Sequence, residues 1–360
     1  MRREYLDGLR GWASLFVLFS HLGPMFLLST KKMTSIPFVM DGQLAVYIFF
    51  VLSGYVLSIG FLEKGNPEIL KSLAIRRYTR LTIPIIASCS IALILVSIGA
   101  MKNLPAGIAA ESPWLESFYR FPTSTLDMIR YSIFDVYADK SANSYNAVLW
   151  TMQYELTGSM LVLGGLYALR GAKLRTVGYF ISIAATTYLQ SPLAAFALGV
   201  MLADLTCCRK TLSAKALVVL RRASWFTLVC ALTLAMARTG FIASPAGLSL
   251  IAAVILASII CNPCIQKTLS TRISLQLGHL SFPLYLTHLL VICSASSWIY
   301  LSAAEQGLSR VEVSAITALS TVALSLFGAM AFAPIEHFAI RLSQRISNTL
   351  IHRHPKRVAG

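Results

Sequence analysis

Long apolar runs dominate this chain of 360 residues and constrain its fold more than any other feature. Hydrophobic residues make up 56% of the sequence and charged residues only 13%, whereas a soluble domain carries about 25% charged residues. A transmembrane helix needs about 20 mostly apolar residues. The candidate runs cover residues 11–30, 39–62, 81–101, 147–169, 177–190, 192–206, 223–240, 245–263, 280–302 and 312–333. The sequence therefore predicts an all-α, polytopic integral membrane protein with about ten transmembrane helices and no separate soluble domain.

The basic residues indicate the orientation, because Lys and Arg accumulate in cytoplasmic loops. An even number of spans places both termini on one side of the membrane. If that side is the cytosol, the inner segments carry 23 of the 31 Lys and Arg residues and the outer segments carry the other 8. We therefore predict that both termini are cytoplasmic. The same distribution explains most of the net charge of +16, so we expect no nucleic-acid partner.

We expect a single transmembrane domain over residues 1–340, followed by a basic cytoplasmic tail over 341–360. Contact of this tail with anionic lipid is one interpretation, but ordinary positive-inside charge explains it as well. The longest outer segment, residues 102–146, has room for one or two short interfacial helices. We expect this segment to contribute to the choice of acceptor.

The seven cysteines give little information about function. Cys261 and Cys264 form a CxxC pair, but a zinc site needs four ligands, and the sequence has no second pair and no nearby histidine. We interpret both as small apolar residues at a helix end, and we expect no metal site.

Ionisable residues inside a membrane are costly, so each is a candidate for function. Arg10 and His21 are eleven residues apart, which is close to three full helical turns, and Asp7 shares their face. His21 is predicted to lie roughly 15 Å from the inner end of its helix, near the membrane midplane. Taken singly, Arg10 is also explained as a snorkelling anchor and His21 as an interhelical hydrogen-bond partner.

Glu155 and His288 are predicted to reach a similar depth, because each lies roughly 12 Å along its own helix. Three titratable groups near one level suggest a polar cavity in which a buried carboxylate orients or charge-balances a histidine base. A structural His–Glu pair that only fixes the helix bundle is the alternative.

Two further features are weaker on their own. Arg76, Arg77 and Arg80 lie where the third helix leaves the cytosol, and arginine side chains bind phosphate well; positive-inside charge predicts the same cluster. Ser53 and Gly54 interrupt an apolar helix with small residues. Such residues let a neighbouring helix or a thin ligand approach closely, and helix packing is the default interpretation.

Taken in order, these segments resemble acyltransferase family 3, a family of membrane proteins. The segments that match its motifs are Leu6 to Arg10 with His21 eleven residues after Arg10, Phe49 to Gly54, Arg77 and Arg80, Leu149 to Glu155, Gly278 to His288 with Ser281 and Tyr285, and Pro334 to Glu336. The chain departs from the motifs at Met152 and Phe282, and its last motif has the proline before rather than after the glutamate. Some members carry an additional soluble hydrolase-like domain, and we expect none here.

The resemblance implies acyl transfer, often of acetyl, from a cytosolic acyl-CoA to a hydroxyl group. The implied acceptor is a surface polysaccharide such as lipopolysaccharide or exopolysaccharide, a lipid-linked glycan or a secreted molecule. The resemblance also implies a bacterial inner-membrane location, essential roles for Arg10 and His21, and donor binding by Arg77 and Arg80. It implies no permanently bound cofactor beyond the acyl-CoA donor.

Together, the residues and the resemblance give a hypothesis for the site. His21 acts as the general base, Glu155 orients His21 or stabilises its charged form, and Arg10 holds the thioester end or stabilises developing charge. Direct transfer and a covalent acyl-histidine intermediate are both open. Arg76, Arg77 and Arg80 bind the CoA phosphates, and the pantetheine arm passes at the level of Ser53. Asp7, Tyr285 and His288 are further candidates. A proton-coupled transporter or flippase would also place His and Glu at the midplane, and a scaffold subunit with an inactive site is a third reading.

Overall fold

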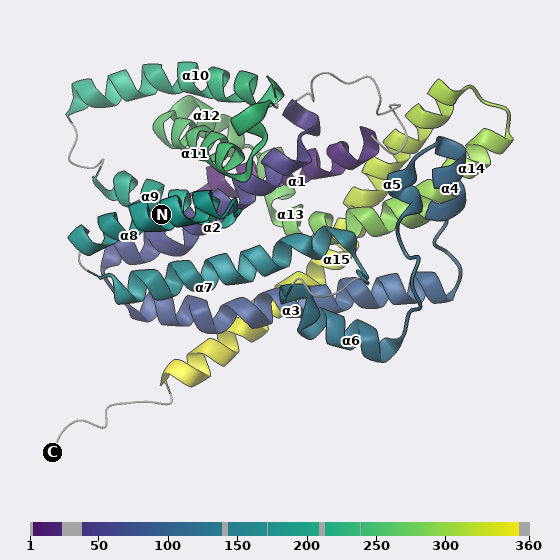
Figure 1. Ribbon diagram of the computed structural model, residues 1–360, viewed down its shortest axis with the longest axis horizontal. Helices are drawn as coiled ribbons and strands as arrows, with labels where there is room; N and C mark the ends of the chain where they lie inside the picture. Colours follow the sequence, from purple (N-terminus) through teal and green to yellow (C-terminus); the bar gives the residue numbers. More distant parts are fainter. Residues whose placement is uncertain are drawn as a thin grey trace. The chain divides into compact units, whose positions relative to one another are not determined.

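The computed structural model describes residues 3–23, 38–138, 143–170, 172–208, 213–237 and 239–352, and every regular element in these ranges is helical (Figure 1). This agrees with the all-α prediction. The chain divides into two compact units. The first contains residues 1–45, 82–153 and 269–336, and the second contains residues 46–81, 154–268 and 337–360. The prediction of a single domain over 1–340 stays a prediction.

Helices from three parts of the chain make up the first unit. They are α1 (Glu4–Leu22), η3 (Phe38–Met40), the start of α2 (Gly42–Lys64), the second half of α3 (Glu68–Ser97), α4 (Asn103–Ala110), α5 (Pro113–Glu116), α6 (Thr125–Ile133), η4 (Asp135–Tyr137), η5 (Ala147–Thr151), the first two residues of α7 (Met152–Ala168), α13 (Arg272–Val291), η8 (Ile292–Ser296), α14 (Ser297–Glu305) and the larger part of α15 (Arg310–His352).

The packing of α1 along α13 is the most extensive contact of the first unit, and three glycines make it close. A Cβ atom on Gly8 would overlap the carbonyl oxygen of Leu269, three residues before α13 begins, and one on Gly11 would overlap the backbone nitrogen of Gly278. A Cβ atom on Gly278 would in turn overlap the carbonyl oxygen of Asp7. Small residues of this kind let two membrane helices bring their backbones together. The close packing fixes how α1 and α13 present their other side chains to each other.

We expect Gly11→Ala to destabilise the protein by about 1–3 kcal/mol, because an added methyl group in a filled helix interface forces the helices apart. Thermal unfolding in detergent measures the loss. Gly165→Ala is the matched control, since a Cβ atom there meets nothing within 4 Å, and a glycine-to-alanine change inside a helix is otherwise favourable. Equal unfolding temperatures for the two variants would show that the α1–α13 interface accommodates the added methyl group.

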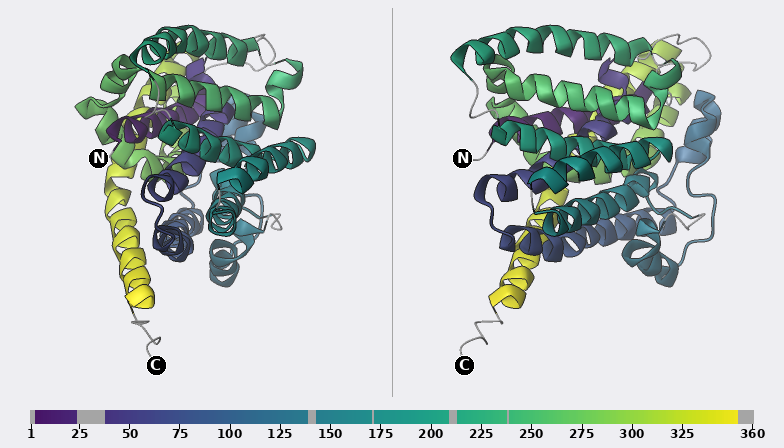
Figure 2. Two further views of the ribbon diagram at one scale, coloured as in Figure 1. Left: turned by 90° about the vertical axis from the view of Figure 1, so that its left-hand side faces the viewer. Right: turned by 60° about the vertical axis from the view of Figure 1, so that its left-hand side comes forward.

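The second unit contains the remaining helices. They are the larger part of α2, the first half of α3, most of α7, α8 (Ala172–Tyr188), α9 (Leu193–Cys208), α10 (Ala214–Ala237), η7 (Gly240–Ala243), α11 (Pro245–Cys261), α12 (Pro263–Leu269) and the end of α15. Within this unit α8 packs on α9, α9 on α11 and α11 on α10. The last pair runs side by side in every view (Figures 1 and 2).

Small residues also bring α2 and α9 together in the second unit. A Cβ atom on Gly54 would overlap the carbonyl oxygen of Phe196, and one on Gly199 would overlap the carbonyl oxygen of Val51. The Phe196 ring stacks on Phe50, with ring centroids 5.2 Å apart. Gly54 thus packs against a neighbouring helix, as the default interpretation of the Ser53-Gly54 sequence expects.

Five helices of the described residues are long and apolar enough to cross a membrane, judged by length and composition. They are α2, α3, α10, the continuous run from α13 to α14, and α15; a sixth results if α11 and α12, which meet at a bend of 100°, form one span. The described part of each of the ten predicted ranges overlaps one or more helices. However, α7, α8, α9 and α11 have only 16 or 17 residues, and α1 begins with charged residues. The number ten and the orientation of the termini stay predictions.

Several boundaries differ from those expected. The described part of the first helix ends at Leu22, and the rest of the predicted span over 11–30 lies outside the described residues. The described part of the segment 102–146 contains three short α-helices, α4, α5 and α6, and the 3-10 helix η4, where one or two short helices were expected. Helix α15 continues through Arg341 and Arg345 to His352, so the described part of the basic tail is helical.

Candidate functional site

The imidazoles of His21 and His288 form a hydrogen-bonded pair in the first unit. Nδ1 of His21 lies 3.0 Å from Nε2 of His288, and the planes of the two rings are nearly parallel, with 14° between them. His288 is buried and lies in the last turn of α13, and His21 is one residue from the end of the described part of α1. The close α1–α13 packing therefore joins two histidines that are 267 residues apart in sequence.

A second hydrogen bond of His288 determines which nitrogens carry protons. Nδ1 of His288 lies 2.9 Å from the carbonyl oxygen of Leu284, and a carbonyl oxygen only accepts, so this Nδ1 must carry the hydrogen. In a neutral His288 ring, Nε2 then has a lone pair and accepts the hydrogen on Nδ1 of His21. A neutral His21 consequently presents the lone pair of its Nε2, the nitrogen that a general base uses.

The segment 102–146 adds a third ring to this pair. The indole of Trp114 stacks on the His21 imidazole, with ring centroids 5.2 Å apart and 18° between the planes. Trp114 lies in α5, which Pro113 begins and the Ser112 hydroxyl caps by accepting from the Leu115 backbone amide. The cap and proline signals were readable in the sequence. The position of the indole beside His21 was not.

Two tyrosines help to hold the segment 102–146. Tyr119 donates to the backbone carbonyl of Tyr145 at 3.2 Å, and Tyr131 shares a hydrogen bond with the hydroxyl of Ser144 at 2.9 Å. Burial raises the pKa of Tyr119 well above its usual value, and burial likewise raises the pKa of Tyr131. Both phenols therefore stay neutral across the physiological pH range.

Tyr285 supports α13 one turn before His288. Its hydroxyl shares a hydrogen bond of 2.7 Å with the Thr151 hydroxyl and also contacts the carbonyl oxygen of Val148. The buried side chain of Asn146 donates to the Ser88 hydroxyl at 2.7 Å and to the Leu286 carbonyl at 2.8 Å. These bonds tie η5 to α13. Tyr285 thus holds α13 in place in the first unit, a role that sequence reasoning did not assign.

Glu155 lies in the second unit, where its carboxylate binds Arg77. The Nη2 atom of Arg77 donates to Oε1 of Glu155, and Ser53 donates its hydroxyl to the same oxygen at 2.6 Å. The Nε atom of Arg77 donates to the Ser159 hydroxyl at 2.8 Å. Ser159 is four residues after Glu155 and so shares its helix face, a spacing that could have identified it. Pairing of Glu155 with His21 stays a prediction.

The three arginines of α3 differ in their surroundings. Arg77 is buried, and two of its guanidinium nitrogens are engaged by Glu155 and Ser159. Arg76 and Arg80 are partly exposed, and Nε of Arg76 is a buried donor with no hydrogen-bond partner among the described residues. Binding of CoA phosphates by Arg77 would therefore compete with its contacts to Glu155 and Ser159.

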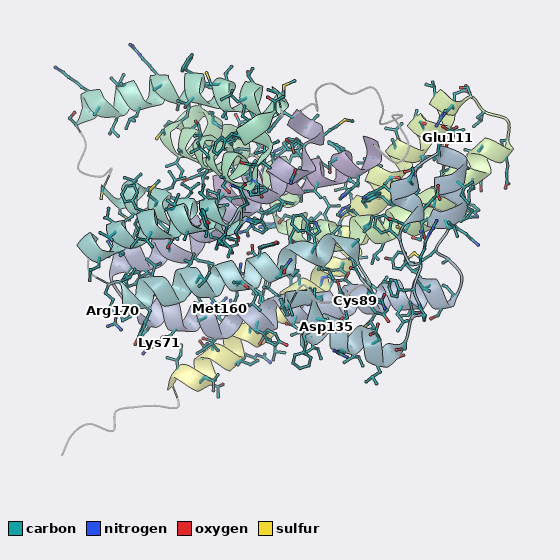
Figure 3. The ribbon with its side chains drawn as sticks, in the orientation of Figure 1. Lys71, Cys89, Glu111, Asp135, Met160 and Arg170 are labelled. Carbon is teal, nitrogen blue, oxygen red and sulfur yellow. The ribbon has the colours of Figure 1, made fainter. Side chains whose placement is uncertain are left out.

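A groove lies beside these residues, between the start of α3 and the end of α7. Its volume is about 250 Å³ and its lining is mostly apolar. Lys71 and Arg170 lie near one end of it and Met160 lies farther along α7 (Figure 3). The guanidinium of Arg170 stacks on the Tyr167 ring at 4.3 Å from the ring centroid.

Arg10 and Asp7 lie on α1, the helix that carries His21. The helix is continuous from Glu4 to Leu22, so the predicted common face of Arg10 and His21 holds. Eleven residues separate them by about 16 Å along the axis. The backbone of Asp7 packs against Gly278. Contact of Arg10 with a thioester stays a prediction.

Comparison with known proteins decides the family. Residues 3–334 match the model for the acyltransferase domain of acyltransferase family 3, which is most of the chain. The chain belongs to acyltransferase family 3. This membership confirms the resemblance inferred from the motifs. Together with the apolar helices, it identifies a multi-pass membrane protein of that family.

Two fungal proteins show low sequence similarity to this family member. The acyltransferase clz18 of Cochliobolus lunatus is 26% identical over 235 residues, covering 47% of this chain and 50% of that protein. The O-acetyltransferase PaAT-1 of Phomopsis amygdali is 28% identical over 199 residues, covering 44% of this chain and 39% of that protein. The chain thus spans half or less of the length of these relatives. No solved structure matches it.

Proposed function

We propose that this protein is a membrane O-acyltransferase that moves an acyl group, in the first instance acetyl, from cytosolic acyl-CoA to a hydroxyl of a glycan. The observation that carries the proposal is the hydrogen-bonded pair of His21 and His288, in which the Leu284 carbonyl leaves Nε2 of His21 as the proton acceptor. Family membership supports acyl transfer. The name of the Phomopsis relative, an O-acetyltransferase, favours acetyl and a hydroxyl acceptor.

In the proposed reaction, Nε2 of His21 removes the proton of the acceptor hydroxyl as its oxygen attacks the thioester carbonyl carbon. The carbon–sulfur bond breaks, and the CoA thiolate takes the proton back from the His21 imidazolium to leave as the free thiol. The ester bond forms on the acceptor. A general base that works in this way contributes about 10²- to 10⁴-fold to a rate.

The proposed topology has ten spans with both termini in the cytosol, which places Arg76, Arg77 and Arg80 on the donor side. The helices of 16 or 17 residues are about 25 Å long, close to the apolar thickness of a bilayer. Arg76 and Arg80 are the proposed contacts for the CoA phosphates, since arginine binds phosphate through paired donors. The plasma membrane of a bacterium is the proposed location, and a surface polysaccharide, a lipid-linked glycan or a secreted glycan is the proposed acceptor.

The test uses sealed vesicles with labelled acetyl-CoA added to one face. Inside-out vesicles that contain the chain are expected to label a glycan or lipid fraction, whereas matched vesicles without the chain are not. Right-side-out vesicles are expected to give no label, because the donor cannot reach its side. Label from right-side-out vesicles alone would contradict a cytosolic donor site. Absence of label with acetyl and longer acyl-CoAs, together with movement of a labelled glycan across the membrane, would indicate a carrier instead.

A further inference from the structure

The helical hairpin of α4 and α5 is held together by the buried side chain of Asn103 and is joined to η8 by a backbone hydrogen bond. The side chain of Asn103, which is only 2% exposed, donates to the backbone carbonyls of Leu115 and Phe118 at 3.1 and 3.0 Å. The backbone amide of Lys102 donates to the Cys293 carbonyl at 2.8 Å. Cys293 lies in the π-helical segment η8, which directly follows α13. Segments of this kind often occur at functional sites.

This hairpin holds the Trp114 indole in a defined orientation. Phe118 packs edge-on against the indole, with ring centroids 4.4 Å apart and 86° between the planes, and His21 lies against its face. The rings of Trp114, His21 and His288 have similar orientations, with 18° and 14° between successive planes. Trp114 nevertheless keeps 39% of its surface exposed. Burial of the indole is therefore incomplete, and its defined contact is with the face of the proposed base.

The face of an indole carries partial negative charge and attracts a cation. A neutral imidazole gains little from this field, whereas an imidazolium is stabilised by it. In the proposed reaction His21 changes from the first form to the second as it takes the acceptor proton. An interaction that strengthens only as charge develops lowers the barrier of the chemical step.

We propose that Trp114 is a positioning residue that stabilises the protonated form of His21 during acyl transfer. The proposal rests on the proposed function and deepens it, because it gives the outer segment a part in the chemistry. Trp114 acts through His21, while His288 holds the same ring from its Nδ1 edge. The acceptor is then left to approach at the Nε2 edge.

The test replaces Trp114 by tryptophans that carry increasing numbers of ring fluorines. Fluorine withdraws charge from the ring face and scarcely changes its size, so a merely structural role would not respond to it. We expect kcat to fall stepwise along the series, by about tenfold in all, with KM for acyl-CoA and the unfolding temperature unchanged. The same series at Trp298 is the control, because that side chain is 60% exposed on α14.

A kcat that stays constant along the Trp114 series, in a chain whose native form transfers label, would overturn this inference and leave the proposed function intact. If the native chain transfers no label, a second measurement still tests the contact. The emission of 5-hydroxytryptophan at position 114 is expected to fall on acidification, because a protonated imidazole quenches an indole, and His21→Gln is expected to abolish this change. Identical acid responses in the two forms would overturn the inference without any transfer assay.

Discussion

Replacing His21 by alanine is expected to lower kcat for acyl transfer by about 10²- to 10⁴-fold in membranes that contain the chain. The imidazole is the only proton acceptor that the proposed reaction uses, and its removal leaves the α1–α13 packing at Gly11 and Gly278 intact. The measurement is label transfer from acetyl-CoA, normalised to the amount of folded protein. His279→Ala is the matched control, because His279 lies on α13 but is exposed.

The partner of His21 allows a sharper version of this experiment. His288→Leu removes the acceptor for Nδ1 of His21, so the ring can turn and place its hydrogen on the wrong nitrogen; we expect kcat to fall by about 10²-fold or more. His288→Gln is expected to retain much of the activity, because an amide can accept from His21 through oxygen and donate to the Leu284 carbonyl through nitrogen.

The kinetic signature separates orientation from packing. Loss of orientation lowers kcat and kcat/KM together and leaves the unfolding temperature unchanged. If the leucine and glutamine variants of His288 were equally active, the hydrogen-bond assignment would be wrong. If full activity survived His21→Ala, the proposed base would be wrong and the reaction would need another proton acceptor.

Removing Arg77 is expected to destabilise the protein by about 3–5 kcal/mol, because it leaves the carboxylate of Glu155 buried without its partner. The two side chains are only 11% and 13% exposed, so water cannot replace the lost contact. Arg77→Met is the variant of choice, since it keeps the length of the side chain. Unfolding in detergent, followed by circular dichroism, measures the change.

A double variant removes both charges of the pair. We expect the double variant Arg77→Met, Glu155→Leu to recover most of the lost stability, because an apolar pair can replace a buried ion pair at little cost. Arg341→Met is the control, since Arg341 is exposed on α15. A double variant no more stable than Arg77→Met alone would show that the pair contributes little. If Arg77→Met were as stable as the native protein but bound acyl-CoA more weakly, Arg77 would instead be a direct contact for the acyl-CoA donor.

Much of the fold could be predicted because apolar length is a local property. The runs near 39–62 and 312–333 coincide with α2 and α15, and the break at Ser191-Pro192 coincides with the end of α8 and the start of α9. The motifs from Arg10 to His288 identified the family. Apolar length did not determine the number of spans or their boundaries, because α7, α8, α9 and α11 are only just long enough to cross a membrane.

The site was predictable only in part. The spacing of charged residues indicated that His21 and His288 reach a similar depth, and the structure joins them. Depth alone does not identify partners, and Glu155 binds Arg77 and Ser53 in the second unit. The contact of Trp114 with His21 depends on the fold of the outer segment, where aromatic, proline and charged residues follow no periodic pattern. Sequence reasoning could not place it.

The choice of a second imidazole, rather than a carboxylate, as the partner of His21 has an electrostatic consequence. A carboxylate would place a permanent negative charge beside the base, and that charge would repel the oxyanion that forms when the thioester is attacked. With His288 in this position the resting pair is neutral, and the proton that leaves the acceptor creates two opposite charges side by side. The net charge of the reacting groups therefore stays zero from start to finish. A compound that mimics the tetrahedral oxyanion should accordingly bind more tightly than a neutral ester of the same shape.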